Sequence, residues 1–311
     1  MRSIFLIIIY LLIPFYISSQ EKEINHSESD FSKKMEWFSE AKLGIFIHWG
    51  IYSVNGISES WSFFNGYISH SDYMKQLDGF GAEKYDAKEW ANIIKESGAK
   101  YTVITTKHHD GFALWNSKYG KLNSLNSSKS KSDLLTPFVK EVRDRGLKLG
   151  LYYSLPDWSY EDYTFHTNKI KRYNIEDQPK RWGKFLKFRD NQLNELKKRY
   201  NPDLWWFDGD WEQNAKEWGS ENLKKLLQKN SHNVIFNSRL NSYGDYETPE
   251  IGIPVYRPSS KYWELCMTIN DSWGYQQNDT NYKSPMQIMD LFVDTLSKGG
   301  NLLLNISPKS D

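Results

Sequence analysis

Two carboxylates follow a short apolar run in the middle of the chain, at Asp208 and Asp210. The run before them, residues 204–207, consists of leucine, two tryptophans and phenylalanine. Such a run is typical of a buried strand, and the Asp-Gly-Asp that follows is a turn signal. A carboxylate that leaves a strand at the carboxyl-terminal edge of a parallel barrel is placed for catalysis. The alternative is that Asp208 only caps the next helix.

Other predicted strand ends carry groups that can bind a ligand or transfer protons. They are His48, His108, His109, Tyr152 and Tyr153. Residues that are far apart in sequence but meet at one face are how a barrel builds an active site. The histidines and Asp110 are also possible zinc ligands, so a zinc-dependent hydrolase is an alternative. Adjacent histidines on an extended chain point apart, however, and the usual ligand spacing is absent.

A second group of carboxylates, Glu247, Glu250 and Glu264, comes later in the chain. Hydrolysis of a glycoside with retained configuration needs an ionised carboxylate as nucleophile and a protonated carboxyl group as acid, about 5 to 5.5 Å apart. Asp208 and one of these glutamates could supply the pair. Glu250 follows Asp208 by 42 residues (250 minus 208), which is about one strand and helix. The residue pattern alone leaves the three glutamates as competitors for the acid.

Short apolar runs alternate with amphipathic stretches along most of the chain. We expect strands at 43–47, 101–105, 149–154, 204–207, 234–237 and 301–305, and helices near 87–98, 132–146, 180–199, 216–229 and 288–295. This alternation predicts an α/β fold with a mostly parallel sheet, and the length favours a (β/α)8-like TIM barrel. An open doubly wound sheet is the alternative, but no glycine-rich phosphate loop follows the first strand.

The first 19 residues have the composition of a secretory signal peptide. Arg2 precedes an apolar run over residues 4–13, which is too short to span a membrane comfortably. An uncleaved anchor is the alternative. Residues 20–34 are polar and without period, so we expect an irregular leader before a catalytic barrel over 35–311. The protein is therefore expected to be secreted or periplasmic, with no stable membrane association after signal cleavage.

The composition narrows the class of ligand. There are 40 Lys and Arg against 39 Asp and Glu, a net charge of +1, which gives no reason to expect a nucleic-acid partner. Cys266 is the only cysteine, so the chain forms no internal disulfide. Aromatic residues make up 16% of the chain, with 13 tryptophans. This content suits a ligand with flat apolar faces, such as a sugar, and it leaves the oligomeric state open.

Six motifs are spread over residues 36–308. They are residues 41–50 (AKLGIFIHWG), 107–112 (KHHDGF), 150–154 (GLYYS), 204–209 (LWWFDG), Trp263-Glu264 with 272–275 (SWGY), and 299–305 (GGNLLLN). In this order they closely resemble the α-L-fucosidases of glycoside hydrolase family 29. The resemblance implies a (β/α)8-like barrel, no metal or other cofactor, and hydrolysis of terminal α-L-fucosyl residues of glycans or glycoconjugates through a covalent fucosyl-enzyme. A catalytically inactive carbohydrate-binding homologue is the alternative.

The resemblance also places functional residues. It puts the nucleophile on Asp208 and the acid/base on Glu250, with Glu247 in reserve. It puts contacts to the sugar on His48, His108, His109, Tyr152 or Tyr153, Trp206 and Arg239. Because fucose carries a methyl group where most hexoses carry a hydroxymethyl group, an apolar wall is also needed, and the candidates are Phe46, Trp49, Trp206 and Trp273. Glu59 is a doubtful ligand, because Ser60 separates it from Trp61 whereas the two are adjacent in the family.

The pattern of the family continues past position 311 into a last barrel helix and a C-terminal β-sandwich, and both are missing from this chain. Parallel strands bury both faces, so without that helix the strand around residues 302–304 is expected to be poorly covered. We therefore expect the sequence to be a fragment, and an unusually short member of the family is the alternative.

Overall fold

The computed structural model describes residues 29–311. The expected signal peptide and most of the expected leader lie outside these residues. Residues 29–41 form a helix, so the last part of the leader, expected to be irregular up to position 34, is helical. The helical period of Phe31, Met35 and Phe38 becomes visible only when the sequence window extends beyond the polar stretch.

The chain divides into two compact units, Met1–Glu40 and Ala41–Asp311, and the second unit contains the sheet and the candidate site. Within the described residues, no helix has both the length and the apolar character needed to cross a bilayer.

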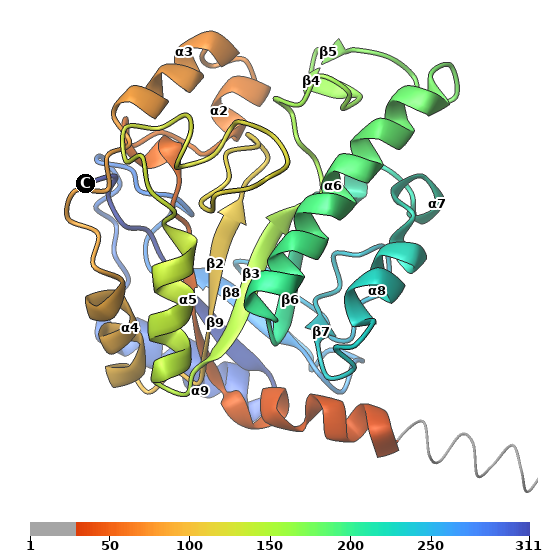
Figure 1. The fold of residues 1–311 in the computed structure, drawn as a ribbon. Coiled ribbons are helices and arrows are strands. Elements are labelled where there is room, and N and C mark those ends of the chain that lie inside the picture. Colours follow the sequence, from red (N-terminus) through yellow and green to blue (C-terminus); the bar gives the residue numbers. More distant parts are fainter. Residues whose placement is uncertain (1–28) are drawn as a thin grey trace, which may run out of the picture. The chain divides into compact units, whose positions relative to one another are not determined.

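Seven parallel strands form the sheet of the second unit (Figure 1). In spatial order they are β7 (Ile235–Phe236), β6 (Leu204–Asp208), β3 (Lys148–Ser154), β2 (Tyr101–Lys107), β1 (Leu43–Ile47), β9 (Asn301–Ile306) and β8 (Glu264–Thr268). The first strand, β1, pairs with the last strand, β9, which is typical of a barrel. Leu302 and Leu303 of β9 are fully buried, so the expectation of poor cover is wrong for these two residues.

An irregular segment, residues 245–251, joins the two edge strands of this sheet. Parallel bridges connect Asn237 with Tyr246 next to β7, and Glu247 with Trp263 next to β8. The backbone N–H of Cys266 in β8 also donates to the carbonyl of Pro249 at 3.1 Å. The segment thus takes the place of an eighth strand, and the sheet curls into the expected (β/α)8-like form.

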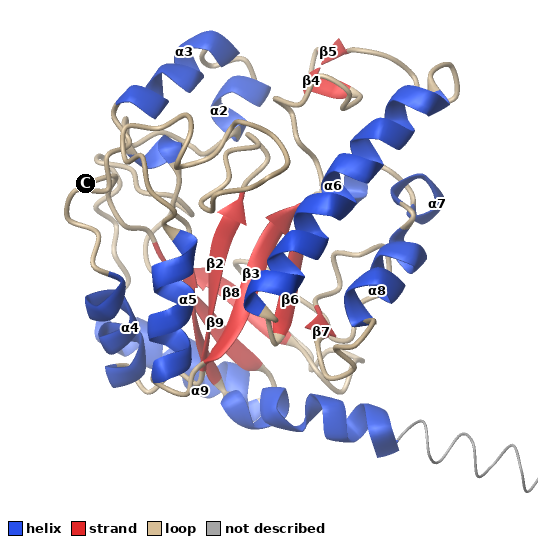
Figure 2. Cartoon of the chain, in the orientation of Figure 1, coloured by secondary structure: helices blue, strands red, loops and turns tan. Residues whose placement is uncertain are grey.

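Helices cover the outside of the strands (Figure 2). They are α4 (Ala87–Glu96), α5 (Leu135–Asp144), α6 (Pro179–Tyr200), α7 (Ala215–Trp218), α8 (Ser220–Gln228) and α9 (Pro285–Ser297). Local signals fix their ends: the Asp86 side chain caps α4 by accepting from two backbone N–H groups, and Ser284 forms a capping box with Gln287 at the start of α9. The expected strands and helices are present with ends that differ by a few residues, except that the helix expected over 216–229 is divided into α7 and α8 at Gly219, which has a φ of +62°.

The loops that follow β1 and β3 carry additional small elements. They are η1 (Ile51–Ser53), α2 (Trp61–Phe64), α3 (His70–Met74) and η2 (Lys75–Asp78) after β1, and the hairpin of β4 (Phe165–Thr167) and β5 (Ile170–Lys171) after β3. Figure 1 shows α2, α3 and the hairpin beyond the arrowheads of β2 and β3. The long loops therefore lie at the carboxyl-terminal face of the barrel, where the expected catalytic residues also lie. None of these elements, nor β8, was predicted from the sequence.

Candidate active site

Strand β6 delivers Trp206 and Asp208 to the interior of the barrel. Alternate residues of a strand face opposite sides, and their neighbours Trp205 and Phe207 pack into the core shared with the helices. Gly209 follows with a φ of +84°, and a Cβ atom there would lie 2.3 Å from a proline side chain. Only glycine fits such a turn, which leaves the Asp208 carboxylate at the end of the strand.

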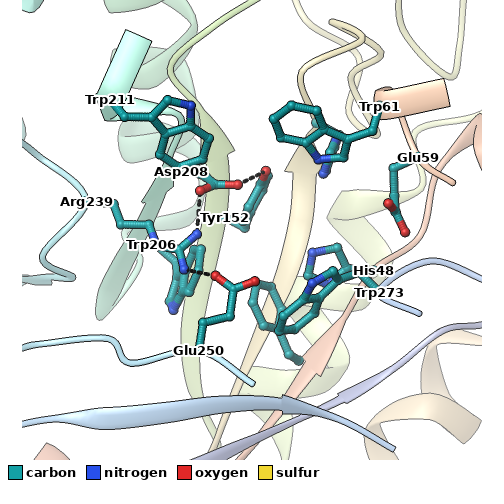
Figure 3. A pocket seen from close by; sticks show the side chains of 12 residues that line it. His48, Glu59, Trp61, Tyr152, Trp206, Asp208, Trp211, Arg239, Glu250 and Trp273 are labelled. Carbon is teal, nitrogen blue, oxygen red and sulfur yellow. Dashed lines mark hydrogen bonds and ion pairs between the residues drawn. The ribbon is translucent and has the colours of Figure 1, made fainter. Parts of the chain in front are cut away.

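One guanidinium group joins two carboxylates (Figure 3). Arg239 lies in the loop after β7; its Nη1 donates to Asp208 Oδ1 at 2.6 Å, and its Nη2 donates to Glu250 Oε2. The guanidinium also lies over the ring of Trp206, 4.6 Å from the centroid, as a cation–π contact. The Tyr152 hydroxyl donates to Asp208 Oδ2 at 2.9 Å. Asp208 and Glu250 are thus separated only by one guanidinium group and its hydrogen bonds.

The surroundings of Asp208 keep its carboxylate ionised. Burial alone would raise the pKa of Asp208, but the charge of Arg239 and the hydrogen bonds from Arg239 and Tyr152 outweigh burial, and the pKa lies below its usual value. His109 Nε2 lies 3.5 Å from Asp208 Oδ2, and burial lowers the pKa of His109 to about 4. Because His109 is neutral at pH 7, Arg239 supplies the compensating charge. An ionised carboxylate is the form that a nucleophile requires.

The three glutamates that competed for the acid occupy different places. Glu250 lines the pocket that contains Asp208, and Glu247 does not. Glu264 is fully buried inside the barrel, where Oε1 accepts from Trp206 Nε1 at 2.9 Å and Oε2 accepts from the Tyr101 hydroxyl at 2.5 Å. Burial raises the pKa of Glu264 to about 7. Its hydrogen bond with Trp206 fits a role in holding that ring, whereas Glu250 shares the Arg239 guanidinium with Asp208.

Three histidines are fixed by neutral partners. Nδ1 of His48 lies 2.6 Å from Asn305 Oδ1, Nδ1 of His109 lies 2.6 Å from Ser154 Oγ, and Nδ1 of His108 meets Ser60 Oγ. Burial lowers the pKa of His48 to about 4 and that of His108 well below its usual value. All three imidazoles are therefore neutral at pH 7 and can hydrogen-bond to an uncharged ligand.

A pocket of about 330 Å³ lies at Asp208, near the lower end of the volume range for small-molecule sites, and His48 and His108 line it whereas His109 does not. It is lined by Phe46, His48, Glu59, Trp61, His108, Tyr152, Trp206, Asp208, Trp211, Arg239, Glu250 and Trp273. Figure 3 shows Trp206 and Tyr152 beside the Asp208 carboxylate, and Trp273 beside His48. The pocket therefore combines an aromatic wall with two carboxylates and neutral imidazoles.

A family model for alpha-L-fucosidases matches residues 14–311 of the chain. The chain belongs to the alpha-L-fucosidase family. The alpha-L-fucosidase of Branchiostoma floridae is 34% identical over 88% of this chain and 66% of its own length. The chain thus spans about two thirds of that relative.

Solved alpha-L-fucosidases have the same fold. Isoenzyme 1 from Paenibacillus thiaminolyticus is 32% identical and gives a TM-score of 0.82 over 90% of this chain and 71% of its own. A family 29 alpha-L-fucosidase from Bacteroides thetaiotaomicron, solved as a trapped covalent intermediate with 2-fluoro-fucosyl fluoride, is 33% identical and gives a TM-score of 0.78 over 90% of this chain and 70% of its own.

In this alpha-L-fucosidase family member the structure brings Glu59 into the pocket, although its spacing to Trp61 had made it doubtful. Glu59 Oε1 accepts from the backbone N–H of Gly274, and burial raises the pKa of Glu59. The intervening Ser60 contacts His108, so the additional residue holds an imidazole of the pocket while Glu59 and Trp61 still line it. Trp61 and Trp211 also line the pocket, and sequence reasoning missed both because they lie in loops of unpredicted conformation.

Two aromatic candidates face away from the pocket. Tyr153 alternates with Tyr152 on β3, and its hydroxyl donates to Gln192 of α6 at 2.7 Å. Trp49 is buried, and its Nε1 donates to the carbonyl of Lys309 at 2.7 Å. The expectations that Tyr153 contacts the sugar and that Trp49 forms the apolar wall are therefore corrected. Strand alternation places Tyr153 on the outer side of β3, and Trp49, two residues beyond the end of β1, packs into the hydrophobic core.

The alternative of a zinc site depended on His48, His108, His109 and Asp110. Among the residues that the structure describes, no three His, Cys, Asp or Glu side chains form a group that could hold a metal ion. Asp110 instead accepts from the Tyr73 hydroxyl at 2.5 Å and from the backbone N–H of Phe112 at 2.9 Å. The groups that zinc would need are engaged in separate contacts.

Proposed function

We propose that this protein hydrolyses terminal α-L-fucosides of glycans or glycoconjugates with retention of configuration. The observation that carries the proposal is the pair of carboxylates, Asp208 and Glu250, held on one guanidinium at the pocket. Membership of the alpha-L-fucosidase family supports the choice of sugar.

In the first step, a carboxylate oxygen of Asp208 attacks the anomeric carbon while the bond to the leaving oxygen breaks. Glu250 gives its proton to that oxygen. In the second step, water attacks the anomeric carbon, the bond to Asp208 breaks, and Glu250 takes up the proton of the water. Glu250 must release Arg239 to carry a proton, so we expect Arg239 to turn toward a sugar hydroxyl when substrate binds.

The pocket walls suit the two sides of fucose. Phe46, Trp206 and Trp273 offer an apolar surface for the methyl group, whereas His48 and His108 are neutral and suit ring hydroxyls. A site built to hydrogen-bond a hydroxyl rejects analogues that lack it, since its buried polar groups are left unpaired.

Covalent trapping tests the proposal. Incubation with 2-fluoro-fucosyl fluoride should release fluoride and add one 2-fluoro-fucosyl group to the peptide that contains Asp208, as read by mass spectrometry. Asp208→Gly should lower turnover of an aryl α-L-fucoside by several orders of magnitude, and azide should restore part of it as the β-fucosyl azide. Absence of aryl fucoside turnover by the wild type would instead favour an inactive carbohydrate-binding protein.

We also propose that residues 1–19 direct export, so that the mature protein is secreted or periplasmic. The support is the sequence alone: Arg2 followed by an apolar run over residues 4–13. N-terminal sequencing of the exported protein should find cleavage near residue 19, and an intact N-terminus at the membrane would contradict it.

A further inference from the structure

Trp211 is the only exposed tryptophan among residues 29–311, with 56% of its surface accessible, and it lines the candidate pocket. In Figure 3 its ring stands near Asp208, across the pocket from Trp61. Single exposed apolar residues are common on protein surfaces and need no explanation by themselves. The way in which Trp211 is held separates it from such residues.

Both neighbours of Trp211 are fixed. Trp211 lies in the short helix η3 (Asp210–Glu212) directly after Gly209. On one side, the Asp210 carboxylate accepts from the backbone N–H of Asn241 at 2.8 Å. On the other side, the Glu212 carboxylate accepts from Trp158 Nε1 at 2.9 Å and from the Tyr163 hydroxyl. The turn is therefore rigid while the Trp211 ring projects into solvent, so a ligand that contacts the ring orders little of the chain.

The exposure of the lining residues separates a deep part of the pocket from a rim. His48, Glu59, His108 and Asp208 are all buried, whereas Glu250 and Trp211 are exposed. A fucosyl ring held by the deep residues places its anomeric carbon next to Asp208. The group attached to that carbon must leave the pocket through the rim, past Glu250 and Trp211.

We propose that Trp211 forms a binding subsite for the sugar to which the fucose is attached. A pyranose ring presents faces of C–H bonds, and these suit the electron-rich face of an indole. A rigid aromatic ring at the rim thus selects a saccharide as the leaving group, in preference to a small alcohol or a peptide side chain. The inference rests on the fucosidase function proposed above and names the substrate class of the same site.

Selectivity between two donors tests the subsite. We would measure kcat/KM for α-L-fucosyl fluoride, whose leaving group is one atom, and for the best-cleaved trisaccharide from a panel of α1,2-, α1,3-, α1,4- and α1,6-linked compounds. The ratio of trisaccharide to fluoride should fall about tenfold in Trp211→Ala, as expected for loss of one aromatic contact of roughly 1.4 kcal/mol. Trp211→Phe should recover most of the ratio, because a ring is restored.

Tyr67→Ala is the matched control, since Tyr67 is 79% exposed and lies outside the pocket lining. Its ratio should equal that of the wild type. An unchanged ratio in Trp211→Ala, including an equal loss on both donors, would overturn the subsite while leaving the fucosidase function intact. A wild type that cleaves fucosyl fluoride and fucosyl peptides but no trisaccharide would overturn the choice of a saccharide. A wild type inactive on fucosyl fluoride would remove the proposed function itself.

Discussion

At the scale of single residues, the neutral histidines suit the uncharged sugar that is proposed as the ligand of the pocket. Their Nδ1 atoms are engaged by Asn305, Ser60 and Ser154. Of the three, only His48 and His108 line the pocket, whereas Nε2 of His109 is buried 3.5 Å from Asp208 Oδ2. Burial keeps their pKa values low, so acid rather than neutral conditions would be needed to charge them. Sugar hydroxyls are uncharged, and they therefore meet uncharged partners.

Replacement of His108 by Ala should lower kcat/KM for an aryl α-L-fucoside by about 10²-fold, because a buried sugar hydroxyl loses its partner. The melting temperature should change little. His232→Ala is the matched control, since His232 is exposed and outside the pocket lining. If His108→Ala instead lowers the melting temperature sharply while the folded fraction keeps normal kcat/KM, His108 is structural and its placement as a sugar ligand fails.

At the scale of the elements, Glu264 joins three strands inside the barrel. It lies on β8 and accepts from Trp206 on β6 and Tyr101 on β2. Trp206 in turn carries the guanidinium of Arg239, which holds Asp208. The buried carboxyl group thus supports the floor of the pocket without lining it.

The raised pKa of Glu264, about 7 against the usual 4.5, predicts how stability depends on pH. When a carboxyl group has a higher pKa in the folded state than in the unfolded state, its protonated form stabilises the fold. This contribution to the free energy of unfolding is complete below the unfolded pKa, and it is lost as the pH rises through the folded pKa. Between pH 4.5 and 7 the wild type should therefore lose on the order of 3 kcal/mol through this one carboxyl group.

The side chain in Glu264→Gln cannot ionise, so the variant should not show this pH-dependent loss of stability. Urea unfolding at pH 4.5 and pH 7 should therefore give a smaller difference in the free energy of unfolding for the variant than for the wild type. Its kcat/KM should remain within about tenfold of wild type, because the amide oxygen can still accept from Trp206. A loss of several orders of magnitude on substrates with poor leaving groups, rescued by a good leaving group, would instead make Glu264 the acid and contradict Glu250.

Periodic elements could be predicted from the sequence, and irregular ones could not. The 3.6-residue stripes predicted α4, α5 and α9, and the apolar run before Asp208 predicted β6. Strand alternation could have separated Tyr152 from Tyr153 once one of them was assigned to the interior. The residue pattern alone could not choose among Glu247, Glu250 and Glu264, and the preference for Glu250 came from the family resemblance. Glu247 and Glu250 lie in an irregular segment whose pairing with β7 and β8 is long-range. Loop conformation likewise hid Trp211.

At the scale of the whole molecule, the pocket draws on nearly the full length of the barrel, from Phe46 to Trp273. A ligand that contacts all of these segments binds only when they are assembled, so it must stabilise the folded state. L-Fucose at about 100 times its Kd should therefore add about 2.7 kcal/mol to the free energy of unfolding, which thermal or urea unfolding would measure.

L-Galactose is the matched control, since it differs from L-fucose only by a hydroxyl on the methyl carbon. At the same concentration it should stabilise the protein less, because the apolar wall of Phe46, Trp206 and Trp273 would have to accept a polar group. Equal stabilisation by the two sugars would contradict the assignment of that wall to the methyl group.

Residues 245–251, which take the place of an eighth strand, also carry Glu250. A change in the number of residues in this segment would therefore move the proposed acid. An inserted residue in the hairpin of β4 and β5 would enlarge a surface loop and leave the strand register alone. The same insertion between Arg239 and Glu250 would shift the bridges to β8 and move Glu250, the proposed acid, away from Arg239. A scan of single-residue insertions should therefore retain activity in the first region and lose it in the second. Residues 245–251 are therefore expected to tolerate insertions and deletions less well than the surface loops do.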